Sequence, residues 1–266
     1  MPADRPAPRR RVLLLALCAV AVTALLVVAA LAPLPFSVVH PGATTDVLGE
    51  SDGGPVITIE GAEVRQPGGE LRMTTIYATA PDARVRLPQV VRGYFSSERA
   101  VLPRDAVYPV GDSLEEIREY NVAQMTESQH TAVQAALLHL GLDETDVQVD
   151  LELANVGGPS AGLLFSLGIV ELLDGDGEGG DLTGGRSVAG TGTIAPDGSV
   201  GAVGGVPLKT QAADRDGASV FLVPRQECGE ARNDLPDGLR LIPVGTLEDA
   251  IDSLAALEAG EPVPSC

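Results

Sequence analysis

The pattern of hydrophobic and polar positions divides the chain into one long uncharged run and many shorter segments. Val12 to Ala32 is an uninterrupted stretch of 21 residues without a charged side chain. At about 1.5 Å per residue, a helix of this length spans the roughly 30 Å hydrocarbon core of a bilayer. The sequence therefore predicts a transmembrane helix over residues 12–32.

The residues on either side of this run bear on its orientation. The basic N-terminus, residues 1–11, predicts a cytoplasmic N-terminus and an extracytoplasmic remainder. A cleaved signal peptide has a similar pattern, and Ala30-Leu31-Ala32 resembles a cleavage site. Pro33 follows directly and is expected to hinder the peptidase, and the run is long for a signal core. We therefore expect an uncleaved, single-pass anchor in the cell membrane.

The next hundred residues give a mixed pattern. Residues 33–55 are rich in Pro, Gly, Ser and Thr, which predicts a linker leaving the membrane. Residues 56–60 and 71–77 are rich in β-branched residues and predict two strands. Residues 79–112 give no clear prediction, and Ser113 is expected to cap a short helix.

Periodicity becomes clearer further along the chain. Apolar positions spaced by one, three and four residues predict a helix over residues 125–140, which ends at Gly141. Residues 147–153 alternate strictly, so they predict a strand with one buried face. Residues 161–173 are apolar nearly all round, which is typical of a helix in the middle of a domain.

The C-terminal third alternates between short strands and helices. The predicted strands are residues 187–194, 198–203, 219–223 and 239–244, and the predicted helices run from Pro207 to Gly217 and from Thr246 to Leu257. These elements predict an α+β fold in one domain over residues 56–260, with its core at about 125–258.

Composition excludes one class of partner. The chain has a formal net charge of −19, and only 3% of its residues are aromatic, with no Trp. Without Asp4 and the four arginines of residues 1–11, the remainder carries 14 basic and 36 acidic residues, or −22. Such a body repels nucleic acid, so no nucleic-acid partner is expected. The core must consist mainly of aliphatic side chains.

Cysteine and histidine give no sign of a metal centre. The three His residues are dispersed, and no Cys/His cluster occurs, so neither a metal nor a cofactor is expected. The acidic, glycine-rich segment 174–180 resembles the start of a calcium loop, but Gly185 stands where a bidentate Glu is needed. Outside the membrane, Cys228 and Cys266 could form one disulfide or remain free thiols, and the sequence leaves both open.

The segment Gly158-Pro159-Ser160-Ala161-Gly162 lies where a loop enters a helix. Glycines allow another chain to approach closely, and a helix N-terminus presents free N–H groups with partial positive charge. These are the ingredients of an oxyanion hole beside a nucleophile. The alternative is that Ser160 simply caps the helix, and on this pattern alone that alternative is favoured.

A nucleophilic Ser needs a base, and lysine usage suggests one. Of the 18 basic residues only Lys209 is a lysine, and no His lies in a comparable glycine-framed setting. Lys can act as a base once its pKa is depressed, whereas Arg cannot. Lys209 follows Gly204-Gly205 in the first turn of a predicted helix with apolar neighbours, and both features lower its pKa. The alternative is a solvated surface lysine. Leu208 directly before Lys209 argues against a nucleotide-binding phosphate loop, which needs Gly there.

Residues 147–257 resemble the proteolytic domain of Lon-type serine proteases. The matching motifs are Gly158-Pro159-Ser160-Ala161-Gly162, Val188-Ala189-Gly190-Thr191-Gly192, Gly198-Ser199-Val200, and Gly204-Gly205 ahead of Lys209. The resemblance implies that Ser160 and Lys209 form a catalytic dyad and that Thr191 hydrogen-bonds near Lys209. It covers about half of the chain strongly, and about three quarters if the N-terminal strands are included.

The closest likeness is to the membrane-anchored Lon-like proteases of Gram-positive bacteria, which carry a PDZ domain. The stretch between Tyr94 and the protease core is too short for such a domain, so we expect none. No ATPase domain is expected either. We therefore expect neither nucleotide binding nor ATP-driven unfolding of substrates. Gly157 stands where the large Lon proteases usually carry an acidic residue, and we expect this difference to affect regulation more than chemistry.

These features together predict a membrane-anchored, ATP-independent serine endopeptidase that cuts unfolded or flexible extracytoplasmic proteins. Ser160 is the expected nucleophile and Lys209 its general base, supported by Thr191, Gly158, Pro159 and Ala161. The family also implies ring-like homo-oligomers. Two alternatives remain: a catalytically silent, membrane-tethered scaffold of the same fold that binds peptides, and a Ser-Lys hydrolase of another class.

Overall fold

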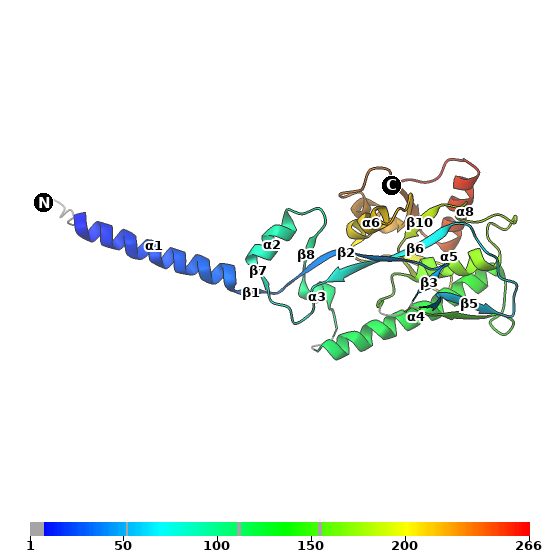
Figure 1. The fold of residues 1–266 in the computed structure, drawn as a ribbon, viewed down its shortest axis with the longest axis horizontal. Helices are drawn as coiled ribbons and strands as arrows, with labels where there is room; N and C mark the ends of the chain where they lie inside the picture. Colours follow the sequence, from blue (N-terminus) through cyan, green and yellow to red (C-terminus); the bar gives the residue numbers. More distant parts are fainter. Residues whose placement is uncertain (1–7, 52, 111–112, 154–155) are drawn as a thin grey trace.

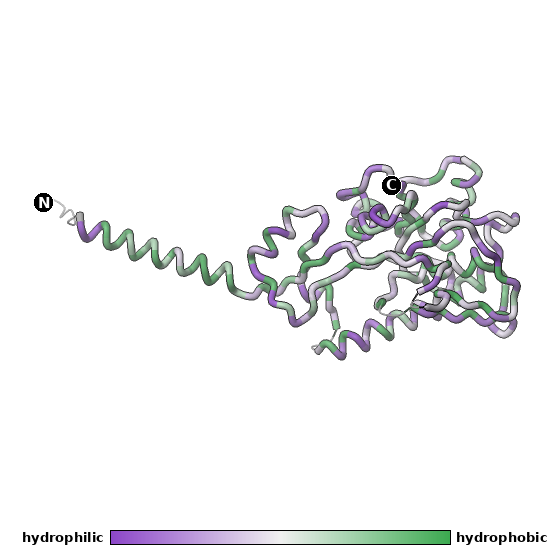
Figure 2. The backbone as a smooth tube through the Cα atoms, in the orientation of Figure 1, coloured by the Kyte–Doolittle hydropathy of each residue, from purple (hydrophilic) through white to green (hydrophobic). Residues whose placement is uncertain are grey.

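The computed structural model describes residues 8–51, 53–110, 113–153 and 156–266. Helix α1 (Pro8–Leu31) extends away from the body and is exposed along most of its length (Figures 1 and 2). Its segment Arg9–Leu31, 23 residues, is long and apolar enough to cross a membrane by length and composition. The predicted span over residues 12–32 coincides with this helix to within one residue at its end. Of the predicted cytoplasmic N-terminus, residues 1–7 lie outside the described residues.

A six-stranded mixed sheet forms the centre of the body. Its strands, in spatial order, are β14 (Arg240–Val244), β13 (Val220–Pro224), β10 (Ser187–Gly190), β6 (Glu70–Ala78), β2 (Phe36–Asp46) and β8 (Ala100–Pro103). The first four run parallel to one another, and β2 is antiparallel to both of its neighbours. Parallel strands bring their carboxyl ends to one edge of the sheet, which positions the site described below.

Strand β2 corrects the prediction of a linker over residues 33–55. It pairs with β6 and β8, and Val38 and Val39 are buried. Pro and Gly suggested an irregular segment, but the two that lie within β2, Pro41 and Gly42, occur where the register with β6 shifts. A Cβ atom on Gly42 would lie 2.3 Å from Thr75 Oγ1, so the strand needs glycine at that crossing.

Four two-stranded pairings surround the main sheet. They join β1 (Pro33–Leu34) to β7 (Val85–Arg86), β3 (Glu50–Ser51) to β4 (Gly54–Pro55), β5 (Ile57–Glu60) to β9 (Gln148–Leu151), and β11 (Thr193–Ile194) to β12 (Val200–Gly201). The predicted strand over residues 147–153 is therefore shorter than expected. Residues 79–112, which gave no prediction, contain β7, β8 and the helices α2 (Leu87–Tyr94) and α3 (Arg104–Val107).

Helix α4 (Leu114–Leu140) is one continuous helix where the sequence suggested two. Ser113 caps it as predicted, because its hydroxyl accepts a hydrogen bond from Glu116 N and its own N–H donates to the Glu116 carboxylate. No Gly or Pro interrupts the join between the two predicted helices, so the backbone continues through it. The helix ends at Gly141, which is left-handed with φ 66°.

Two hydrophobic cores lie on opposite faces of the sheet. Along β13, Val220 and Leu222 belong to one core and Phe221 and Val223 to the other, as the alternation of a strand requires. The first core also takes side chains from α4, α5 (Gly162–Leu173) and α8 (Leu247–Glu258). The second takes them from α6 (Val206–Arg215) and α7 (Cys228–Ala231), the latter preceded by the 3-10 turn Arg225–Glu227.

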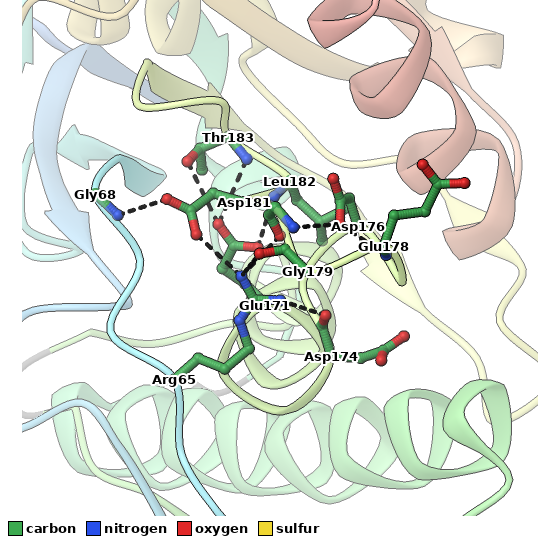
Figure 3. A network of polar contacts seen from close by, with 11 residues as sticks. Arg65, Gly68, Glu171, Asp174, Asp176, Glu178, Gly179, Asp181, Leu182 and Thr183 are labelled. Atoms are coloured by element: carbon green, nitrogen blue, oxygen red, sulfur yellow. Dashed lines mark hydrogen bonds and ion pairs between the residues drawn. The ribbon is translucent and has the colours of Figure 1, made fainter.

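A buried polar network fixes the C-terminal end of α5 (Figure 3). The Glu171 side chain is fully buried and accepts hydrogen bonds from Leu182 N at 2.7 Å and from the N–H and hydroxyl of Thr183. Arg65 donates to the Asp181 carboxylate at 3.2 Å and to backbone carbonyls of the loop that follows α5. The Arg65 side chain thus holds segment 174–180 in place.

Candidate active site

The loop that carries Ser160 is held by α4. Ser128 Oγ donates to Pro159 O at 3.1 Å, and Gly158 N donates to Asn121 O at 3.3 Å. Gly158 has φ +90°, a conformation that L side chains rarely adopt. A Cβ atom on Gly162 would lie 2.8 Å from the Ile194 side chain, so the first turn of α5 packs too closely for any larger residue.

Gly157 also has a steric explanation. A Cβ atom there would lie 2.8 Å from the Asn121 Cβ atom on α4. An acidic side chain at this position would therefore require α4 to move away from the loop. The small residue is a consequence of how closely the helix covers the segment before Ser160.

Ser160 is not a helix cap. The cap residue of α5 is Ala161, and no side-chain hydrogen bond closes the helix start. Among the described residues, the N–H groups of Ser160 and Ala161 donate to no backbone carbonyl. Ser160 itself is partly exposed. Within the described residues, the turn therefore leaves two adjacent N–H groups without a backbone acceptor next to a partly exposed hydroxyl, and such donors are what an oxyanion hole is built from.

Thr191 lies directly after β10, between the two parallel neighbours of that strand. Its N–H donates to Leu222 O at 3.1 Å, which holds it against β13. Its fully buried hydroxyl donates to Ser160 O at 3.2 Å, and Gly192 N donates to the same oxygen at 3.0 Å. Ser160 is thus attached through its carbonyl to the end of the central sheet.

Lys209 reaches the same point from the opposite face. It lies in the first turn of α6, which begins after Gly205 in a left-handed conformation with φ 71°. Its side chain is only 3% exposed, so it is no solvated surface lysine. Lys209 Nζ donates to Thr191 Oγ1 at 2.9 Å. A chain of two hydrogen bonds therefore connects Lys209 through Thr191 to Ser160.

Burial controls the charge of Lys209. Removal from water lowers the pKa of its ammonium group from 10.5 to about 8, and the nearby Glu227 carboxylate partly opposes this by raising it. At pH values a little above neutral, a substantial fraction of Lys209 is therefore the free amine. Among the described residues, Lys209 Nζ and Ser160 Oγ form no direct hydrogen bond.

Glu227 is a site residue that sequence reasoning missed. It is buried on the 3-10 turn after β13, accepts a hydrogen bond from Val203 N at 2.9 Å, and has its pKa raised mainly by burial. The next residue, Cys228, forms a disulfide with Cys266, so the pairing left open by the sequence is settled. The sequence around Glu227 does not distinguish it from the other acidic residues. Its position directly before Cys228 is the one signal that could have pointed to it.

A cavity of about 710 Å³ runs beside the Ser160 loop. Its walls are the N-terminal half of α4, including Ile117 and Met125, and the segment that leads toward Ser160, including Leu151, Leu153 and Val156. The lining mixes apolar side chains with uncharged polar ones and one arginine, and no acidic side chain lies among the residues that the structure describes there.

A family model described as the Lon protease (S16) C-terminal proteolytic domain matches residues 113–256, just over half of the chain. The chain belongs to the Lon protease family. The match begins at the cap of α4 and ends within α8, so it includes Ser160, Thr191, Lys209 and Glu227. Membership of the Lon family shows a serine protease domain. The absence of a PDZ domain and the likeness to Gram-positive relatives stay predictions.

Proposed function

We propose that this Lon family member is a membrane-anchored, ATP-independent serine endopeptidase in which Ser160 is the nucleophile and Lys209 the general base. The observation that carries the proposal is the buried Lys209 amine, whose pKa is lowered to about 8 and which is joined to Ser160 through Thr191. A buried lysine with little charge compensation costs stability, so its presence next to a partly exposed serine needs a chemical reason.

The proposed reaction starts with the free amine of Lys209. It takes the proton of Ser160 Oγ as that oxygen attacks a peptide carbonyl, and the N–H groups of Ser160 and Ala161 bind the resulting oxyanion. Lys209 then gives its proton to the leaving amine, and an ester joins the substrate to Ser160. Water, deprotonated by Lys209, attacks the ester, and the proton returns to Ser160 as the acid product leaves. The hydrogen bond between Oγ and Nζ forms as substrate binds.

Two independent observations support an extracytoplasmic protease body. Arg9, Arg10 and Arg11 precede the apolar part of α1, and a positive cluster favours the cytoplasmic side. Cys228 and Cys266, on the other side of α1, form a disulfide, and such bonds persist in oxidising compartments. Both observations favour the same, extracytoplasmic side of the membrane for the body.

The substrate and energy source are inferred from the site. Lys209 is the only lysine in the chain and lies in the proposed site, so none remains for a nucleotide phosphate loop. Without ATP-driven unfolding, substrates must arrive unfolded or flexible. The apolar side chains in the wall of the cavity near the Ser160 loop would accept a hydrophobic side chain of an extended substrate near the cut bond. Assembly into a homo-oligomer remains an expectation from the family.

The test uses the full chain in lipid nanodiscs with unfolded casein and, separately, with a fluorophosphonate probe that labels reactive serines. The parent protein is expected to cut casein without ATP and to be labelled at Ser160. Ser160→Ala and Lys209→Met are each expected to abolish both activities. Asp214→Asn, an exposed change on the same helix as Lys209, is the matched control and should keep them.

The alternatives predict different results. A peptide-binding scaffold would bind casein without cutting it and would not react with the probe. A Ser-Lys hydrolase of another class would react with the probe at Ser160 but would leave casein intact while hydrolysing small esters or amides. Cleavage that persists in Lys209→Met would show that another group is the base.

A further inference from the structure

Helix α2 exposes an apolar stripe that the body does not use. Leu87, Val91 and Tyr94 are spaced at i, i+4 and i+7, so they share one face, and all three are exposed. The helix packs on the body through a different face. Gly93 is buried there, and a Cβ atom on it would lie 2.6 Å from the Val101 side chain of β8. The stripe is therefore an additional surface.

Two aromatic side chains end this stripe. Tyr94 is 80% exposed and Phe95 82%, more than any other large hydrophobic residue outside α1 in the part of the chain that the structure describes. Their rings meet edge to face with centroids 5.3 Å apart. The chain has only four Tyr, four Phe and no Trp. Exposed aromatic residues are typical of the belt at a membrane–water interface, where one side of the ring is apolar and the other polar.

The surroundings of α2 are basic in an acidic protein. Residues 84–104 contain five Arg and one Glu, a net charge of +4, whereas the whole chain carries −19. Arg84, Arg86, Arg92 and Arg99 are exposed, and none of them forms an ion pair with another described residue. Exposed arginines beside apolar residues match a surface of anionic lipid headgroups.

The topology brings α2 to the end of α1. Pro33 in β1, one residue beyond Ala32, pairs with Arg86 in β7, and α2 begins at the next residue. With strands about 4.8 Å apart and about 3.3 Å per residue, the start of α2 lies within about 10 Å of the end of α1. Figure 1 shows α2 beside that end, and the two helices are in contact.

We propose that the stripe Leu87–Val91–Tyr94–Phe95 of α2 lies in the interfacial region of the same bilayer that α1 spans. The two aromatic rings reach the level of the headgroups, and Arg84, Arg86 and Arg92 contact lipid phosphates. The proposal rests on the anchoring by α1 that is part of the proposed function. A second point of attachment would stop the body from rotating freely about α1. It would also hold the Ser160 loop at a fixed height above the membrane.

The absence of Trp from the chain allows a direct test with the full protein in vesicles. Three single-Trp variants are compared: Phe95→Trp in the stripe, Val22→Trp within α1, and Leu138→Trp, which is an exposed control on α4 (66% exposed). The vesicles contain phosphatidylglycerol and phosphatidylcholine with bromine atoms near either the headgroup or the tail end of the acyl chains, because bromine quenches Trp only at short range.

The proposal expects headgroup-side bromine to remove about half of the fluorescence of Phe95→Trp, tail-end bromine to quench Val22→Trp, and neither to affect Leu138→Trp. If Val22→Trp is quenched but Phe95→Trp is not, the anchor stands and this inference is wrong. If Val22→Trp is unaffected, the anchor itself fails and this inference with it. A shift of Phe95→Trp emission to shorter wavelength without quenching would show a protein partner and would also overturn the proposal.

A second arm tests the arginines. Arg84, Arg86 and Arg92 are changed together to Gln in the Phe95→Trp protein. Quenching should fall in vesicles with phosphatidylglycerol and stay unchanged in vesicles of phosphatidylcholine alone, because only the first offers anionic headgroups beyond the zwitterionic surface. Equal quenching of parent and variant in both vesicles would remove the arginine contacts from the proposal.

Discussion

Glu171 and Lys209 are both ionisable, and both side chains are buried in the same small domain, yet their surroundings differ. Three donors from Leu182 and Thr183 reach the Glu171 carboxylate, and Arg65 lies nearby. Among the described residues, Lys209 has a single hydrogen bond, to the Thr191 hydroxyl, and only the Glu227 carboxylate opposes the effect of burial on its pKa. The Glu171 carboxylate is surrounded by hydrogen-bond donors, whereas the Lys209 amine has almost no partners.

The difference separates two uses of a buried charge. A carboxylate that accepts several hydrogen bonds holds a loop in place and gains little from a change of protonation. An amine with one bond keeps a lone pair ready for a proton, at the cost of stability. The number of partners, more than burial itself, therefore distinguishes the structural site at Glu171 from the proposed reactive site at Lys209.

Replacement of Lys209 by Met should give the largest effect. We expect the peptidase activity to fall by about 10³-fold or more, because the proposed base is lost. The free energy of unfolding should stay equal or rise, since Met fills a similar volume without the cost of a buried amine. Casein cleavage and urea unfolding of the same preparation measure the two quantities. A variant that lost both activity and stability would make Lys209 a structural residue.

Replacement of Glu171 by Ala should show the opposite pattern. The N–H groups of Leu182 and Thr183 lose their buried acceptor, so the free energy of unfolding should fall by roughly 3 kcal/mol. Activity per folded molecule should remain. Glu178→Ala, an exposed change in the neighbouring loop, is the control and should leave urea unfolding unaltered. A normal stability for Glu171→Ala would remove the contrast between the two sites.

The pH dependence provides a third comparison. The pKa of Lys209 is about 8 in the folded protein and 10.5 for a lysine fully exposed to water, so between these values the unfolded chain binds more protons than the folded one. The free energy of unfolding should therefore rise with pH across this window, by about 3 kcal/mol in all, and Lys209→Met should lack the rise. Casein cleavage should increase over the same region with a midpoint near pH 8. A flat stability curve in the parent would contradict the lowered pKa.

Thr191 connects the two halves of the site, and its hydroxyl can be removed without changing its shape. Thr191→Val should reduce activity by about 10- to 100-fold, because Lys209 and the Ser160 loop lose the atom that positions them. Thr191→Ser keeps the hydroxyl and is the matched control. A comparison of kcat with KM should place the loss in kcat. Equal activity of the Val and Ser variants would mean that the hydrogen bonds are incidental.

The smallest expected effect concerns Glu227. Glu227→Gln removes the charge that raises the pKa of Lys209 but retains an oxygen that can accept the hydrogen bond from Val203 N. The midpoint of the activity profile should therefore move to lower pH. Glu230→Gln, an exposed carboxylate on α7, tests whether any nearby negative charge would act in the same way. A shift to higher pH would show that Glu227 acts by another route.

Sequence alone predicted the parts of this molecule that local chemistry determines. Ser160 and Lys209 could be singled out as candidates because small residues frame each of them and because the chain has a single lysine, and the structure joins them through Thr191. Glu227 could not be found, since its role depends on a fold that brings the turn after β13 to Lys209. The N-terminal region was predicted less well. Composition suggested a linker where β2 pairs on both sides, because partners distant in sequence decide the pairing of a strand.

Thr191 lies where helices from opposite faces of the sheet meet, and this has a consequence for the life of the protein. The Ser160 turn depends on one hydrophobic core and Lys209 on the other, so a copy that has formed only one core has no working site. The proposed substrates are unfolded chains, and a copy of this protein that has not finished folding is itself such a chain. If Ser160 and Lys209 act as proposed, activity requires both cores, and a copy that has formed only one of them would be unable to digest its neighbours.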